Sequence, residues 1–64
     1  MHNKVLEVLK PLALQNVGKY DFAVFPVNGY IVIKVFEKCF EKYNFEVHSL
    51  EEVDKIVEEI KAGL

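Results

Sequence analysis

Two runs rich in β-branched and aromatic residues flank an Asn-Gly pair near the middle of the chain. The runs cover residues 20–27 and 30–36, and the pair is Asn28-Gly29. An Asn-Gly pair between two such runs is the strongest short-range sign of a β-hairpin, because both central residues of a type I′ turn need a positive φ. The sequence therefore predicts a two-residue type I′ hairpin in which Val27 pairs with Tyr30.

This register divides the hairpin side chains into two faces, because alternate residues of a strand point to opposite sides of the sheet. The face expected to form the core carries Tyr20, Phe22, Val24, Pro26, Ile31, Ile33 and Val35. The second face carries Asp21, Ala23, Phe25, Val27, Tyr30, Val32, Lys34 and Phe36. A hairpin with one face in water should alternate apolar and polar residues, whereas both faces here are mostly apolar. Pro26 falls at a non-hydrogen-bonded position, which predicts that the first strand is a sheet edge.

Apolar residues at helical spacing predict a first helix over residues 3–17. The stripe consists of Val5, Leu6, Leu9, Leu12 and Ala13, which share one helix face. Asn3 is a suitable N-cap and Gly18 a suitable stop. Pro11 interrupts the pattern, because proline lacks the backbone donor that a helix interior needs. The helix therefore either kinks at Pro11 or ends near Leu9 and is followed by a second short piece.

A tandem repeat follows the hairpin, Phe36-Glu37-Lys38-Cys39 and then Phe40-Glu41-Lys42-Tyr43. Its apolar residues have helical spacing, whereas a continued strand would place Glu37 and Glu41 on the core face. A parallel return to the sheet would need at least about 10–12 residues. We therefore expect a short helical turn within residues 36–43, leading into an antiparallel third strand over residues 43–48.

Residues 49–63 carry the signals of a second helix. Ser49 and Glu52 match the S-x-x-E capping box, in which each side chain bonds the backbone N–H of the other residue. Gly63 is a suitable C-terminal stop. The apolar stripe consists of Leu50, Val53, Ile56, Val57 and Ile60.

The element order is therefore α-β-β-β-α, and we expect a small α+β fold with one domain over residues 1–64. Its three-stranded antiparallel sheet would carry both helices on one face. This order resembles that of double-stranded-RNA-binding domains, which have similar length. Those domains carry a basic cluster at the start of the second helix, whereas the corresponding segment here, Ser49-Leu50-Glu51-Glu52-Val53-Asp54-Lys55, is acidic. The resemblance is one of layout, and RNA binding does not follow from it.

The composition excludes several classes of protein. The chain has 64 residues, of which 52% are hydrophobic and 28% charged, so it is not a disordered segment. We expect no membrane association, since no apolar run approaches the roughly 18 residues of a membrane span. Cys39 is the one cysteine, which excludes an internal disulfide and favours the reducing cytoplasm.

Residues that could support catalysis or metal binding are few. Cys39 and His48 are of the types that form a thiol–imidazole pair, but nothing in the sequence brings them together. His2, Cys39 and His48 lack the short ligand spacing of a structural zinc site. We therefore expect a protein that is not an enzyme and needs no metal or cofactor.

Nucleic-acid binding is the alternative function that the sequence offers. Lysines alternate with aromatic residues over residues 30–42, where Lys34, Lys38 and Lys42 could contact phosphates while the aromatic rings stack on bases. The net charge of −2 and the absence of arginine disfavour this function, because phosphate contacts dominate such binding.

The second face of the hairpin is the strongest functional signal. Its apolar members are Phe25, Val27, Tyr30, Val32 and Phe36. Monomeric proteins rarely leave a continuous apolar patch of several hundred Å² bare. We expect this face to bind a protein partner, in the first place a second copy of the chain. In the alternative arrangement, residues 3–17 fold over it and make a three-layer domain.

Overall fold

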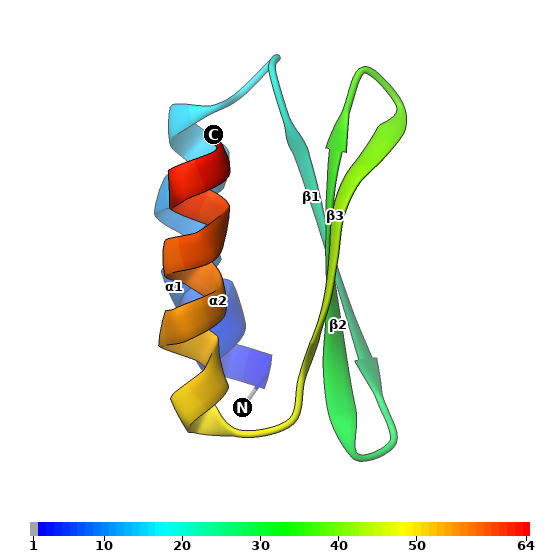
Figure 1. Ribbon diagram of the computed structural model, residues 1–64, viewed down its shortest axis with the longest axis vertical. Coiled ribbons are helices and arrows are strands. Elements are labelled where there is room, and N and C mark those ends of the chain that lie inside the picture. The colour runs from blue at the N-terminus through cyan, green and yellow to red at the C-terminus, as the bar shows by residue number, and fades with distance from the viewer. Residues whose placement is uncertain (1) are drawn as a thin grey trace.

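A computed structural model describes residues 2–64 and shows five elements (Figure 1). They are α1 (His2–Gln15), β1 (Asp21–Val27), β2 (Tyr30–Glu37), β3 (Phe40–Val47) and α2 (Leu50–Gly63). The strands form one antiparallel sheet in the order β1-β2-β3, so β2 is central. The predicted α+β class, element order and three-stranded sheet are confirmed.

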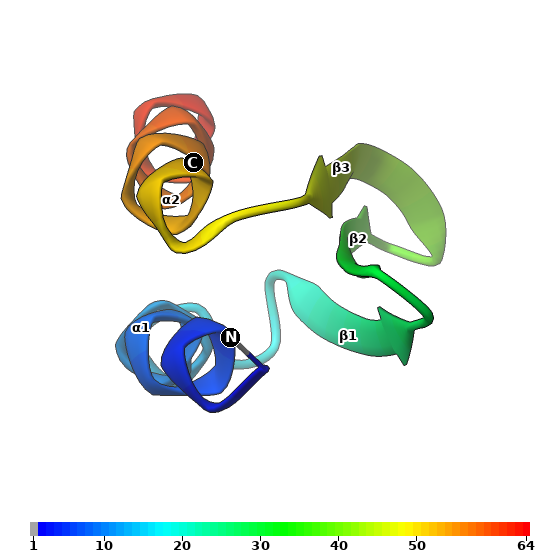
Figure 2. The same cartoon turned by 90° about the horizontal axis from the view of Figure 1, so that it is seen from below.

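The domain has two layers, because both helices lie on the same side of the sheet (Figures 1 and 2). α1 continues through Pro11 as one helix and packs beside α2. The alternative in which residues 3–17 cover the second face of the hairpin is therefore wrong. Among residues 2–64, no helix or strand covers the side of the sheet that faces away from the helices, which we call the outer face.

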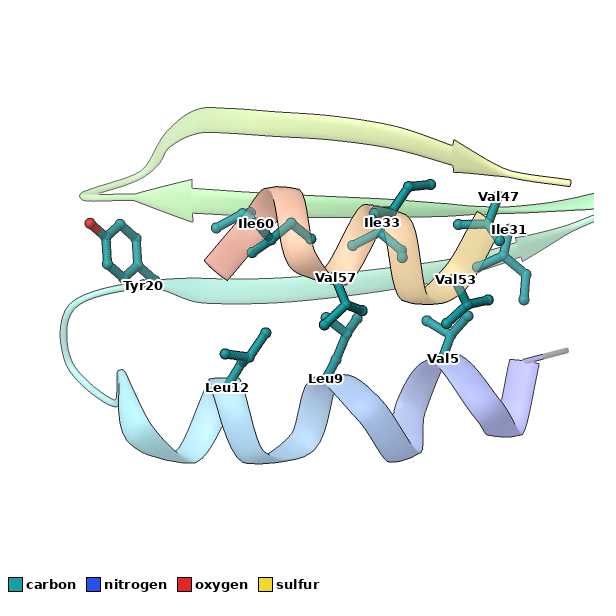
Figure 3. Packing of buried hydrophobic residues seen from close by; sticks show 12 residues of the cluster. Val5, Leu9, Leu12, Tyr20, Ile31, Ile33, Val47, Val53, Val57 and Ile60 are labelled. Atoms are coloured by element: carbon teal, nitrogen blue, oxygen red, sulfur yellow. The ribbon is translucent and has the colours of Figure 1, made fainter. Parts of the chain in front are cut away.

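A single apolar core fills the space between the layers (Figure 3). It consists of Val5, Leu9, Leu12, Tyr20, Ile31, Ile33, Val35, Val47, Val53, Ile56, Val57 and Ile60. Each helix contributes residues three or four positions apart, and β2 contributes alternate residues, as the two periodicities require. Leu6, Pro26 and Leu50 belonged to the predicted core-facing sets but are exposed. Two-layer packing buries a narrower stripe of each helix than the sequence pattern suggested.

The register of the first hairpin agrees with the prediction, but its turn type does not. Val27 pairs with Tyr30, Val24 with Ile33, and Pro26 lies opposite Ile31 on the edge strand β1. Gly29 has a φ of 95°, whereas Asn28 is not among the positive-φ residues. A negative φ followed by a positive one is the pattern of a type II turn, so glycine is still needed at the second position.

The predicted helical turn within residues 36–43 is wrong, because β2 and β3 are joined directly by the two residues Lys38 and Cys39. Their φ values are 51° and 71°, so the type I′ pattern occurs here rather than at Asn28-Gly29. The apolar residues of the tandem repeat have helical spacing, but they lie in two strands and the turn between them. The strand conformation is favoured because pairing of β2 with β3 satisfies the backbone N–H and C=O groups of the central strand. Residues with a Cβ atom adopt this conformation at a cost of about 1–2 kcal/mol each.

Replacing this turn by Asn-Gly should stabilise the protein. We expect the double variant Lys38→Asn, Cys39→Gly to raise the free energy of unfolding by about 2 kcal/mol, because both residues tolerate a positive φ. Urea denaturation measures the change. Cys39→Ala is the control, because it removes the thiol but keeps the Cβ atom, and it should give no comparable gain. An unchanged denaturation midpoint in the double variant would contradict the strained turn.

A β-bulge in β3 decides which face its side chains occupy. Glu37 pairs with Phe40 and Phe36 with Glu41, but Val35 pairs with Tyr43, so Lys42 is an extra residue in the strand. Without this extra residue, continued pairing from the turn would place Tyr43 and the alternate residues after it on the outer face. The bulge turns Tyr43, Phe45 and Val47 toward the helices.

Tyr43 then packs against the end of α2, where it explains a glycine. The helix ends at Gly63 as predicted, but Gly63 is its last helical residue and does not have the positive φ of a left-handed stop. A Cβ atom built on Gly63 would overlap the hydroxyl end of Tyr43. Gly63 is therefore needed for the close approach of a side chain.

Gly63→Ala should destabilise the protein by about 1–2 kcal/mol because it overpacks this contact. In an unconstrained helix the same substitution would stabilise by up to about 1 kcal/mol, so the sign of the effect is informative. The loss should be smaller in a Tyr43→Phe background, which removes the nearest atom. Thermal denaturation of the four proteins in this cycle measures the coupling, and a stabilising Gly63→Ala would contradict the contact.

Candidate protein-interaction face

The outer face has an apolar half, built by β1 and β2. Phe25 lies opposite Val32, and Val27 lies opposite Tyr30. Phe25 and Val27 are 48% and 43% exposed, and the other members of the predicted set are half-buried. The strand register therefore places Phe25, Val27, Tyr30, Val32 and Phe36 together on this one face.

The other half of the outer face is a polar border on β3. Its members are Glu41, Asn44, Glu46 and His48. Glu46 lies opposite Val32, so the border directly adjoins the apolar half. The sequence predicted a third strand over residues 43–48, but without the β2–β3 register it did not place Asn44, Glu46 and His48 beside the apolar residues.

Lys34 lies between the two halves and has partners within the chain. Its Nζ atom is 3.2 Å from a carboxylate oxygen of Glu41. The same ammonium group lies 6.0 Å from the ring centroid of Phe25, at the outer limit of a cation–π contact. A partner that covers this face would therefore meet a lysine that is already paired.

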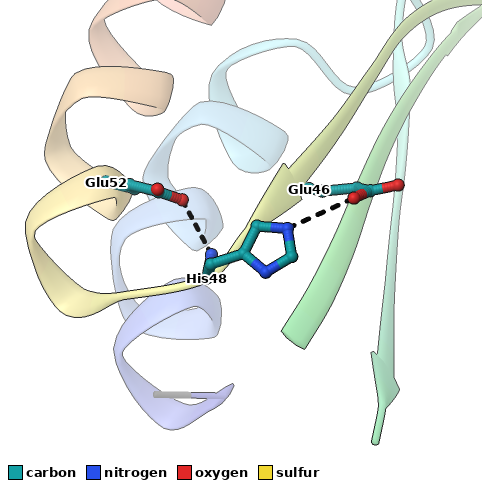
Figure 4. A network of polar contacts seen from close by, with 3 residues as sticks. All are labelled: Glu46, His48 and Glu52. Carbon is teal, nitrogen blue, oxygen red and sulfur yellow. Dashed lines mark hydrogen bonds and ion pairs between the residues drawn. The ribbon is translucent and has the colours of Figure 1, made fainter. Parts of the chain in front are cut away.

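His48 closes the polar border at the end of β3. Its ring stacks on Tyr30 with a centroid distance of 5.0 Å and an interplanar angle of 29°. Its Nε2 atom is 3.2 Å from Glu46 Oε1 (Figure 4). The imidazole thus joins an aromatic residue of the apolar half to a carboxylate of the border.

The capping box predicted for α2 is not formed as expected. The Ser49 side chain makes no capping hydrogen bond, although Ser49 occupies the N-cap position. Glu52 Oε2 instead accepts a hydrogen bond of 2.7 Å from the backbone N–H of His48 (Figure 4). Glu52 therefore reaches one residue further back than predicted and ties the end of β3 to α2.

Of the three lysines proposed for nucleic-acid contact, Lys38 and Lys42 line one surface hollow beside the β2–β3 turn, and Lys34 is not part of its lining. Lys34 lies on the outer face, and Lys38 lies in the β2–β3 turn. Lys42 Nζ lies 3.5 Å from the Tyr20 hydroxyl, to which it donates, and 4.0 Å from Glu37. Partial desolvation lowers the pKa of Lys42, but the hydrogen bond to Tyr20 and the nearby Glu37 carboxylate raise it by more, so the net pKa lies above its ordinary value.

Cys39 and His48 are not close to each other. Cys39 is exposed in the β2–β3 turn, and His48 follows the opposite end of β3. The strand between them is eight residues long, which corresponds to roughly 25 Å at about 3.3 Å per residue. The arrangement provides no thiol–imidazole pair.

Neither helix of the described residues is long and apolar enough to cross a membrane. Comparisons with protein-family models, with curated proteins and with solved structures find no match for this chain.

Proposed function

We propose that the protein is a small, non-enzymatic interaction module that pairs with a second copy of itself through the outer face. The observation that supports this proposal is the position of both helices on one side of the sheet. They leave Phe25, Val27 and their neighbours uncovered on the other side. Covering such a patch is favourable in proportion to the apolar area removed from water, at about 25 cal/mol per Å².

Features of the two sheet edges support pairing through the face. On β1, Pro26 has no backbone N–H to offer to an added strand. On β3, the bulge at Lys42 interrupts the regular row of backbone groups. Prolines, bulges and lysines at edge strands are devices that prevent extension of a sheet by another chain.

A second copy fits the face because the face is divided into halves. A two-fold axis that runs across the strands places the apolar half of one copy on the apolar half of the other, and border on border. Two-fold pairing of one patch with itself is the commonest arrangement in homo-oligomers. Lys34 is already paired with Glu41, so this pairing buries no unpartnered ammonium group.

The free thiol of Cys39 supports the cytoplasm as the compartment of this module. Cys39 is exposed and unpaired in the β2–β3 turn. Exposed thiols persist where glutathione and thioredoxin keep them reduced, and they are oxidised in secretory compartments.

The proposal is tested by the mass of the protein in solution. Sedimentation equilibrium across a wide concentration range should show a mass that rises toward two chains. The thermal midpoint should rise with concentration, because a partner that binds only the folded state stabilises it by mass action. A single-chain mass at about 1 mM, the weak end of specific association, would overturn the proposal.

A further inference from the structure

We infer that the polar border makes self-association depend on pH, with protonation of His48 tightening the pair. The inference rests on the proposed function and concerns the regulation of the same face. Its basis is the position of His48 and Glu46, which lie beside the apolar half and contact each other at 3.2 Å.

The charges on the outer face are unbalanced. Three carboxylates, those of Asp21, Glu41 and Glu46, accompany the one ammonium group of Lys34. With a neutral His48, each face therefore carries two net negative charges. With a protonated His48, it carries one.

Pairing two copies brings these like charges together. Coulomb repulsion between two faces scales with the product of their charges. Halving the charge of each face therefore reduces the repulsion to about a quarter. Because the association of two protonated faces is easier, acidification that protonates His48 should favour the pair.

Burial of Glu46 on pairing also makes protonation of His48 favour the pair. Glu46 lies opposite Val32, directly beside the apolar half of the face, so a second copy would remove water from its carboxylate. A desolvated carboxylate is costly without a cationic partner, and protonated His48 supplies one by a charge-assisted hydrogen bond. The paired state thus binds the imidazole proton more tightly than the single chain does.

The other charged groups near His48 belong to α2. Glu52, Lys55 and Glu59 line one side of the shallow surface hollow that also includes Glu46 and His48. They lie on the helix layer, which faces away from the outer face. A second copy on the outer face therefore leaves their surroundings in water, and the change on pairing falls on Glu46 and His48.

The experiment compares dissociation constants at about pH 5.5 and pH 8 in low salt, a range in which neither carboxylates nor lysines ordinarily titrate. Sedimentation equilibrium of the wild-type protein should show tighter pairing at the lower pH, on the order of tenfold. His48→Gln should remove this pH dependence. His2→Gln is the matched control, because His2 lies in α1 on the opposite side of the sheet, and it should behave as wild type.

Glu46→Gln provides an independent gain of affinity. It removes one carboxylate from each face, so pairing at pH 8 should become several-fold tighter and its pH dependence smaller. A wild-type dissociation constant that is equal at both pH values, or a dependence that survives in His48→Gln, would overturn this inference while the proposed function stood. A single-chain mass at both pH values would overturn both.

Discussion

Val32→Glu is expected to abolish self-association while the protomer keeps its fold. Val32 lies on β2 between Phe25 and Glu46, at the centre of the outer face. A carboxylate placed there has no unpaired cationic partner, because Lys34 is already paired with Glu41, and it would lose its water when a second copy covers it. Such a buried, unpaired charge costs about 3–5 kcal/mol, which weakens pairing by more than a hundredfold. The mass from sedimentation equilibrium should fall to one chain.

The chain offers matched controls for this substitution. Val17 is 76% exposed in the turn after α1, so Val17→Glu makes the same chemical change away from the outer face. Phe25→Glu can be paired in the same way with Phe40→Glu, because Phe40 is 79% exposed beside the β2–β3 turn. Only the outer-face members of each pair should lose self-association, with circular dichroism unchanged. Dissociation by Val17→Glu, or a persistent dimer of Val32→Glu, would contradict the assigned interface.

Deleting Asn44 should cost far more than deleting Lys42, although both deletions shorten β3 by one residue. Removing Lys42 eliminates the bulge and leaves Tyr43 opposite Val35, so every core residue keeps its face. Without Asn44, Phe45 and Val47 can keep their pairing partners on β2 only if the bulge at Lys42, earlier in β3, is lost. Tyr43 then moves opposite Lys34, on the outer face.

The expected losses differ in size. Deletion of Lys42 should cost little, because it removes only one partly exposed ion pair and one side-chain hydrogen bond. Deletion of Asn44 should cost about 2–4 kcal/mol, because it removes an aromatic ring from the edge of the core. Urea denaturation of both variants gives the comparison. Equal losses would mean that Lys42 is not the extra residue of the bulge.

The first hairpin was predictable because its signals are local. Asn28-Gly29 indicated a two-residue loop, and loop length alone then determined that Val24 faces Ile33. The turn type was not predictable in the same way. The left-handed pair occurs at Lys38-Cys39, where no residue favours it, because strand pairing on both sides imposes the conformation.

The segment after the hairpin was not predictable for a related reason. Phe36, Cys39 and Phe40 fit a helical face, and local pattern alone cannot exclude it. Pairing of β2 with β3 satisfies the backbone of a central strand, which is a tertiary effect that no local motif carries. The bulge at Lys42 is likewise visible only once the positions of Tyr43 and Val47 against the helices are known.

The candidate site was predicted in part. The five apolar residues of the outer face followed from the hairpin register, because alternate residues share a face. The polar border did not follow, because its position depends on the β2–β3 register. The role of Glu52 also depended on tertiary structure, since the S-x-x-E motif indicates Ser49 as its partner, whereas the chain path brings His48 closer.

The contact between two copies can be located directly by nuclear magnetic resonance. Half of the protein is labelled with ¹³C and mixed with unlabelled protein, and an isotope-filtered nuclear Overhauser experiment then detects only contacts between different chains. We expect contacts from the methyl groups of Val27 and Val32 to the rings of Phe25, Tyr30 and Phe36 in the other copy. Intermolecular contacts confined to exposed helix residues such as Leu6 and Leu14, or no such contacts at about 1 mM protein, would contradict this expectation.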